Sequence, residues 1–138
     1  MKKIILSVLG LFGVLVVLVM GVQIIASEAG EVVVVTTRDG SGALSETRLW
    51  IVEHDGSRWL RSGGGAASGW YQQLLVNPEL ELVRGTTRYY HRATPVREMQ
   101  TTVNDLMSEK YGWADSYIGI LFGREDSIAI RLDNLSAP

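Results

Sequence analysis

The protein has 138 residues, no cysteine, 46% hydrophobic residues and a mean hydropathy of +0.13. The lack of cysteine excludes a disulfide-stapled miniprotein and any thiolate metal site, and the apolar content argues against a disordered chain. A formal net charge of −2 gives no electrostatic attraction for DNA or RNA, so nucleic-acid binding is not expected.

The apolar surplus lies at the N-terminus. Residues 4–25 contain no charge, and their plainly polar side chains are Ser7 and Gln23. About 22 helical residues extend about 33 Å, which is enough to cross a hydrocarbon core of about 30 Å. A membrane favours helix even for the β-branched run at 14–19, because an isolated span must satisfy its own backbone hydrogen bonds. We therefore predict a membrane anchor or uncleaved signal over residues 1–29, with membrane lipid as its partner.

A cleaved signal peptide is the alternative, because residues 26–29 include small side chains. The apolar run is longer than the about 7 to 15 residues of that class, which favours a retained anchor. Lys2 and Lys3 flank one end of the run, and Glu28 and Glu31 follow the other. The positive-inside rule then predicts a single-pass protein with a cytoplasmic N-terminus and its domain on the far, periplasmic or extracellular side.

Residues 30–138 are predicted to form one small β-rich domain. Tight turns at 39–42 and 55–56 join neighbouring strands, which implies an antiparallel sheet. Six strands around one core predict a small barrel in a mainly-β (α+β) domain, with two helices, or three if 113–122 is also helical. The expected strands are 32–37, 47–53, 57–62, 79–84, 86–94 and 127–132, and the expected helices are 66–77, 96 to about 110, and 113–122.

Few side chains have the spacing of a known catalytic arrangement. His54 stands in a predicted turn and His91 within a strand, so two isolated histidines provide no metal-ligand spacing. The sequence contains no nucleophile-elbow serine, and neither glycine cluster has Walker or Rossmann spacing. Metal-dependent and serine-based hydrolysis are therefore not expected, and no pair of carboxylates stands out.

Two glycine-containing loops each carry an arginine and hydroxyl groups. Residues 36–42 (Thr-Thr-Arg-Asp-Gly-Ser-Gly) leave one strand, and residues 61–65 (Arg-Ser-Gly-Gly-Gly) leave another just before a helix. Exposed amides at a helix N-terminus favour an anion, so the two loops can be read as a phosphate cradle or as ordinary glycine turns. Trp70 and Tyr71 likewise either pack in the core or form the wall of a pocket for a flat aromatic ligand.

Three short motifs resemble a known family. They are Thr-Thr-Arg-x-Gly-Ser-Gly at 36–42, Ser-Gly-Gly-Gly at 62–65, and Trp-Tyr-Gln-Gln-Leu at 70–74 followed by Asn-Pro at 77–78. They are similar to the flavin split-barrel superfamily, and within it to the deazaflavin-dependent nitroreductase (nitroreductase/quinone reductase-like) family. The resemblance extends over residues 31–132 and implies a six-stranded antiparallel split β-barrel that binds FMN or a deazaflavin.

The resemblance also implies a set of cofactor-binding residues. The Ser41-Gly42 turn and residues 62–64 would lie beside the cofactor's phosphate or phosphorylated tail. Trp70 and Tyr71 would begin the helix that borders the same pocket, and Tyr117 would lie near the ring. The expected residues are Arg38, Ser41, Gly42, Arg48, Ser62, Gly63, Gly64, Trp70, Tyr71, Gln73 and Tyr117.

The motif at 36–42 departs from the family pattern. Where the family has Gly-Arg-Lys, this sequence has Arg38-Asp39-Gly40, so a lysine is replaced and a carboxylate enters an expected phosphate site. A carboxylate repels phosphate. Arg48, on the next strand, would supply the missing positive charge.

These observations predict a membrane-anchored oxidoreductase that reduces a quinone-like or nitro-aromatic acceptor. The cofactor would supply the redox chemistry, so no catalytic side chain is assigned. The alternative is a non-catalytic split-barrel module that binds a small ligand or partner and has lost its cofactor. The resemblance also implies a homodimer. Reduced deazaflavin is a cytoplasmic electron source, so the predicted orientation and that cofactor do not agree with each other.

Overall fold

The computed structural model describes residues 1–27 and 30–136. Its strands and helices follow the order β-β-β-α-β-β-α-α-β after the N-terminal helix, which confirms the predicted mainly-β fold. The elements are α1 (Lys2–Ser27), β1 (Val32–Arg38), β2 (Leu44–His54), β3 (Ser57–Ser62), η1 (Gly65–Ala67), α2 (Gly69–Val76), β4 (Glu79–Arg84), β5 (Thr87–Pro95), η2 (Arg97–Met99), α3 (Gln100–Tyr111), α4 (Trp113–Phe122) and β6 (Ile128–Asn134). The domain boundary expected after residue 29 lies outside the described residues.

The six strands close into an antiparallel barrel in the order β1-β2-β3-β6-β5-β4, which is completed by pairing of β4 with β1. Alternation along the strands decides which side chains enter it. Val33 and Val35 of β1, Ile51 of β2 and Leu60 of β3 all point into the barrel core and are fully buried. The apolar side chains that alternate along the sequence of these strands therefore line one continuous core.

A second apolar cluster lies outside the barrel, beneath α3. Val103 and Met107 of α3 pack there against Val52 of β2 and Trp59 of β3. Both faces of β2 and β3 are therefore covered, and the 3.6-residue period predicted for this segment is confirmed as a packed helix face. The helix begins at Gln100 rather than 96, because Val96 is extended and residues 97–99 form a 3-10 turn.

The helix predicted over 66–77 is shorter than expected. α2 begins at Gly69 after the 3-10 turn η1, and it ends at Val76 because a residue before proline, here Asn77, disfavours helical geometry. Trp70 and Leu74 are buried in the barrel core, as their spacing indicated. Leu75 is 57% exposed, so it does not belong to that packed face.

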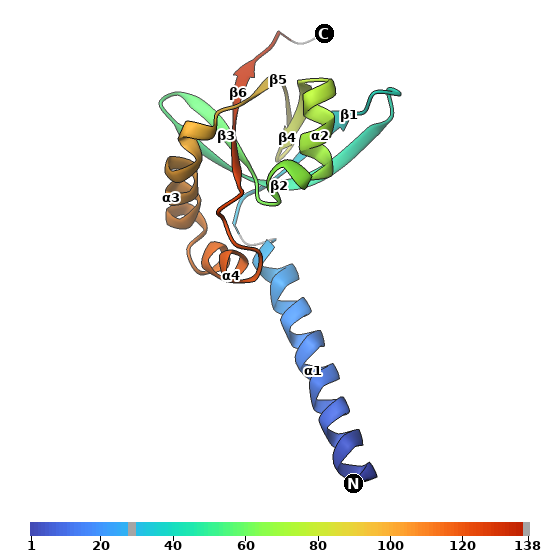
Figure 1. Ribbon diagram of the computed structural model, residues 1–138. Helices are drawn as coiled ribbons and strands as arrows, with labels where there is room; N and C mark the ends of the chain where they lie inside the picture. Colours follow the sequence, from blue (N-terminus) through green and yellow to red (C-terminus); the bar gives the residue numbers. More distant parts are fainter. Residues whose placement is uncertain (28–29, 137–138) are drawn as a thin grey trace.

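The N-terminal segment forms one continuous helix, α1, which projects away from the barrel (Figure 1). By length and composition it could cross a membrane, and a signal sequence would pass the same test. Of the other helices, α4 lies beside its C-terminal end (Figure 1). Helix formation over the apolar run is thus confirmed, whereas its insertion and orientation remain predictions.

Candidate functional site

A pocket of about 160 Å³ lies where β2, the end of β3, α3 and α4 meet. It brings together two predicted site residues from separate segments, Arg48 and Gly63. The indole of Trp50 stacks on Tyr111 with ring centroids 4.4 Å apart, and aliphatic surface completes the pocket. The lining residues are Arg48, Leu49, Trp50, Arg61, Gly63, Met107 and Ile118.

The charges around this pocket distinguish it from two larger hollows on the barrel. It is lined by two arginines and by no carboxylate. A hollow of about 280 Å³ beside Arg38 includes two glutamates, and one of about 520 Å³ beside Gly64 includes Glu125 and Asp126. Because carboxylates repel an anion and guanidinium groups attract it, the α3–α4 pocket is the better site for an anionic aromatic ligand.

A buried ion pair fixes Arg61 and the adjacent helix α4 to the barrel. The Nη2 atom of Arg61 lies 2.6 Å from Oδ1 of Asp115, and Nη1 donates to Asn104 at 3.2 Å. Arg124 pairs with the other carboxylate oxygen and donates to the main-chain oxygen of Asp115 at 2.5 Å. The side chain of Asp115 is 0% exposed and that of Arg61 is 9% exposed, so each charge depends on its partners.

The β1–β2 turn is closed by its own carboxylate. Oδ1 of Asp39 accepts hydrogen bonds from the main-chain N–H of Ser41 (2.8 Å), its hydroxyl (2.7 Å) and the N–H of Ala43 (2.9 Å). The hydrogen bond from the Ser41 hydroxyl, and then that from Ala43, hold the pKa of Asp39 below its usual value. Arg38 donates to the Gly42 carbonyl at 3.0 Å. Asp39 thus takes the donors that a phosphate would need, so the residues of this turn do not fit a phosphate group.

The hydroxyl of Ser62 is likewise hydrogen-bonded within the glycine loop after β3. Ser62 is buried and donates to the Gly65 carbonyl at 2.7 Å, and its oxygen lies 2.8 Å from the hydroxyl of Ser68. Gly65 has φ +61°, and a Cβ there would lie 2.3 Å from the Asp126 carbonyl oxygen. Gly63 and Gly64 are exposed. The hydroxyl therefore holds the loop in shape, and the outer surface of the loop is formed by glycine backbone.

The two loops lie at opposite ends of α2 and do not form one cradle. A Cβ added at Gly40 of the β1–β2 turn would lie 3.7 Å from Cγ1 of Val76, at the C-terminal end of α2. Ser62 contacts Ser68 at its N-cap. Val76 is eight residues after Ser68, a rise of about 12 Å along the helix. A single phosphate would not reach both loops.

The remaining predicted site residues take varied positions. Trp70 and Tyr71 are buried in the barrel core, as expected if they only pack. Gln73 accepts a hydrogen bond from Thr37 and donates to Ser45 at 3.3 Å, which ties α2 to the first hairpin. The hydroxyl of Tyr117 donates to the Val19 carbonyl of α1 at 3.1 Å. Cofactor contact by these residues remains a prediction.

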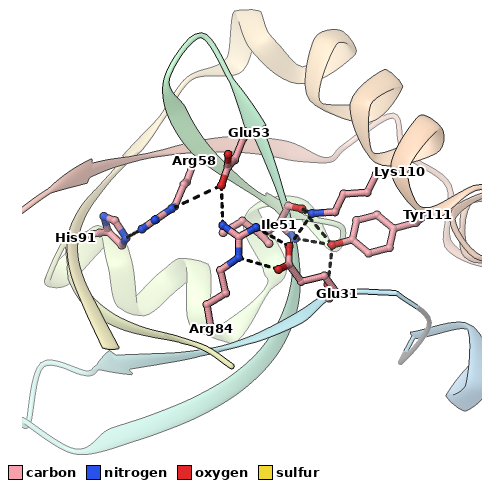
Figure 2. Close-up of polar contacts among 8 residues, drawn as sticks. All are labelled: Glu31, Ile51, Glu53, Arg58, Arg84, His91, Lys110 and Tyr111. Atoms are coloured by element: carbon pink, nitrogen blue, oxygen red, sulfur yellow. Dashed lines mark hydrogen bonds and ion pairs between the residues drawn. The ribbon is translucent and has the colours of Figure 1, made fainter. Parts of the chain in front are cut away.

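One end of the barrel holds a network of charges (Figure 2). Arg84 of β4 makes a two-pronged contact with Glu31, at 2.7 and 2.9 Å, and lies 2.6 Å from Glu53. Lys110 adds a 2.7 Å contact to Glu31. Hydrogen bonding to Arg84 lowers the pKa of both Glu31 and Glu53, and these contacts raise the pKa of Arg84. Glu31, just before β1, is thereby held to β4 and α3.

The main chain at the same end is held by Tyr111. Its hydroxyl donates to the Glu31 carbonyl at 2.6 Å and accepts from the Ile51 N–H at 3.0 Å. Burial raises the pKa of Tyr111 to about 12. The phenol therefore stays protonated near neutral pH and works as a structural hydrogen-bonding group.

Comparisons with known proteins identify this architecture. No protein-family model and no curated protein matches the chain. Solved structures do match: the heme storage protein HutZ of Vibrio cholerae (16% identity, 81% of this chain and 87% of that chain, TM-score 0.61) and a conserved hypothetical protein of Mycobacterium tuberculosis (16%, 85% and 80%, 0.62). An F420-H2-dependent reductase (FDR-A) matches at 21% identity over 74% of this chain and 93% of that chain, with a TM-score of 0.58.

The chain has the split-barrel fold. At these identities the comparisons establish the fold and not the ligand. The resemblance inferred from three short sequence motifs is thus confirmed at the level of architecture.

Sequence reasoning missed the residues that fix the elements of this split barrel to one another. Asp115 is the single charged residue in the otherwise apolar helix 113–122, which was a usable signal for a buried ion pair. The network around Arg84 had no such signal, because Glu31, Glu53 and Lys110 come from distant segments that only barrel closure brings together.

His91, on β5 of the split barrel, gives a testable dependence on pH. It is fully buried, and its Nε2 lies 3.3 Å from Nη1 of Arg58 (Figure 2). Burial, and then the charge of Arg58, lower the pKa of His91, against an opposing contribution from Asp133. Below about pH 6.5 an unfolded histidine takes up a proton that the folded protein does not accept. Stability therefore falls as the pH decreases from about 6.5 toward the folded-state pKa.

We expect the urea midpoint of the full chain in mild detergent to fall between about pH 7.5 and about pH 5.5, and His91→Gln to flatten that decrease. His54→Gln, which removes the partly exposed histidine at the end of β2, is the matched control and should keep the parent slope. An unchanged slope in His91→Gln would show that another group titrates.

Proposed function

We propose that this protein is a membrane-anchored split-barrel oxidoreductase that binds FMN or a deazaflavin and reduces a quinone-like or nitro-aromatic acceptor. The observation that carries the proposal is the pocket between β2, α3 and α4, which has two arginines and no carboxylate and borders the helix packed on α1. A lipid-soluble acceptor would reach it from the membrane side. Similar structures include an F420-H2-dependent reductase and a putative 5-nitroimidazole resistance protein, which supports this class of chemistry.

One of the pocket residues would attract the cofactor by charge, and others would pack against its ring. When bound, the cofactor supplies hydride or electron transfer. Arg48 would attract its anionic part, Arg61 would stay paired with Asp115 and hold the pocket wall in place, and Trp50, Met107 and Ile118 would exclude water from the ring. At about 160 Å³ the pocket is smaller than the about 300 to 1,000 Å³ of typical ligand sites. A homodimer that completes the site would resolve this difference, and a similar structure described as a domain-swapped dimer supports such pairing.

A second function is favoured by the β1–β2 turn. Because Asp39 satisfies the turn donors, the phosphate end of a flavin has no place there. A non-catalytic module that binds a small ligand or partner through the α3–α4 pocket would need no phosphate site. This alternative and the enzyme share the same pocket and the same anchor.

Cofactor titration of the full chain in detergent separates the two functions. FMN and oxidised deazaflavin are each added while the visible absorption and cofactor fluorescence are recorded, and acceptor reduction is then followed with the reduced cofactor. Gly63→Trp fills the pocket from an exposed position with open space at its Cβ, and we expect it to weaken binding at least about tenfold, or by about 1.4 kcal/mol. Ala66→Trp, on the neighbouring hollow, is the matched control and should bind normally.

Each outcome decides between the candidates. Binding and acceptor reduction that Gly63→Trp abolishes and Ala66→Trp preserves would support the oxidoreductase. A parent protein that binds neither cofactor would overturn it and leave the non-catalytic module. Binding that neither variant affects would place the site elsewhere on the barrel.

We also propose that the N-terminus is cytoplasmic and the barrel lies on the far side of the membrane. Lys2 and Lys3 before the span support this orientation. With the barrel on that side, FMN is the more suitable cofactor, because reduced deazaflavin is made available in the cytoplasm.

A further inference from the structure

Helix α4 exposes apolar side chains beside α1. Trp113, Ile120 and Phe122 are 59%, 84% and 61% exposed. Trp113, Tyr117 and Ile120 recur at a spacing of three to four residues and so share one face of the helix. The single charge of α4, Asp115, is buried in its ion pairs with Arg61 and Arg124. The outer face of α4 is therefore large, apolar and uncharged.

The contact between α4 and α1 fixes the position of this face along the length of α1. Val16, Val19 and Val22 are 38–39% exposed, whereas Leu15 and Val17 are 55% and 70% exposed, so one stripe of α1 is partly covered. The hydrogen bond from Tyr117 to the Val19 carbonyl lies on that stripe. Figure 1 shows α4 against the last turns of α1 and not against its middle.

The rise of an α-helix gives the depth in the bilayer at which α4 contacts α1. If the hydrocarbon core begins at Ile4, about 20 residues at about 1.5 Å each span its roughly 30 Å and end near residue 23. The Val19 carbonyl would then lie about 6 Å inside the edge of the hydrocarbon. The tyrosine of α4 reaches that level, so the helix itself must lie at the interface. A Trp and a Tyr on one face are typical of side chains at that depth.

We propose that α4 is a membrane-interface helix, with Trp113 and Ile120 of this face inserted among the lipids around α1. The proposal rests on the membrane anchor of the proposed function, because α1 brings α4 to the bilayer. Its occupant is lipid because the apolar face continues directly from the exposed apolar surface of α1. Burial of such a face contributes favourably in proportion to the apolar area removed from water.

The absence of cysteine makes the depth directly measurable. Three single-cysteine variants of the full chain, Leu11→Cys, Ile120→Cys and Ala43→Cys, are spin-labelled and reconstituted in phosphatidylcholine vesicles. Leu11 lies within α1, Ile120 is on α4, and Ala43 is in the exposed β1–β2 turn on the far side of the barrel (Figure 1). Electron paramagnetic resonance then compares the accessibility of each label to oxygen, which enters lipid, with that to a water-soluble nickel chelate.

We expect oxygen to dominate at Leu11→Cys and Ile120→Cys and the nickel chelate to dominate at Ala43→Cys. Lipid exposure at position 11 with water exposure at position 120 would overturn the α4 proposal while leaving the anchor. Water exposure at position 11 would overturn the anchor and, with it, the insertion of α4. Strong spin–spin broadening at position 120, with low access for both reagents, would show a second copy of the chain on this face and would overturn the proposal.

Discussion

Asp115→Asn is expected to lower the free energy of unfolding by about 3 to 5 kcal/mol, the cost of breaking a buried ion pair by removing one partner. The substitution keeps the size of the side chain but removes the charge that both Arg61 and Arg124 face. Arg61 is 9% exposed, so its guanidinium would remain in the protein without a counter-charge. Both β3 and α4 lose a shared attachment, and the pocket between them loses one wall.

Urea unfolding of the full chain in mild detergent, followed by tryptophan fluorescence, measures this loss. Asp105→Asn is the matched control, since Asp105 is an exposed carboxylate on α3, and surface substitutions of this kind usually change stability by less than about 0.5 kcal/mol. Equal midpoints for the two variants would show that the buried carboxylate does not hold α4 in place.

Gly65→Ala is expected to lower the free energy of unfolding by about 2 to 4 kcal/mol, from left-handed strain together with overpacking. At φ +61° the backbone is in a region that residues with a Cβ rarely adopt, and the added carbon would meet the Asp126 carbonyl oxygen at 2.3 Å. That oxygen belongs to the main chain and has no rotamer with which to move away. The loop before β6 would have to shift.

Gly63→Ala provides the comparison, because open space surrounds the position of its Cβ and the same unfolding measurement applies. We expect it to leave the urea midpoint close to that of the parent. The pair separates two roles within one glycine run: the third glycine is required by the fold, and the first is available to the pocket. Equal stability of the two variants would show that the backbone at Gly65 relaxes freely.

The order of the elements along the chain and most element bounds were predictable, because they depend on local periodicity and turn chemistry. Alternation in β1 and the Asp-Gly turn after β2 are local signals, and the structure has both. The same is true of the apolar period in α3. The early end of α2 at Val76 follows from the proline two residues later.

The chemistry of the candidate site was less predictable, because it depends on which donors are already satisfied. Ser41 and Ser62 have the residue types of an anion cradle, but Asp39 and Gly65 use their hydroxyls. The motifs predict that these hydroxyl groups lie in the two loops, but they do not indicate which atoms the hydroxyls bond to. The pocket itself combines Arg48, Gly63 and Ile118, three positions that only the closed barrel and the placement of α4 bring together.

The barrel is connected to α1 through the chain itself and through the packing of α4 on α1, and this limits how it can turn. Near the start of β1, Glu31 is clamped by Arg84, Lys110 and Tyr111, and on α4 Tyr117 bonds to Val19. A body held by one tether can rotate in every direction, whereas a second attachment leaves rotation only about the line that joins the two. With α1 in a bilayer, as proposed above, the side of the barrel that carries α4 would then stay near the membrane surface, so a molecule dissolved in lipid would reach it by diffusion in two dimensions.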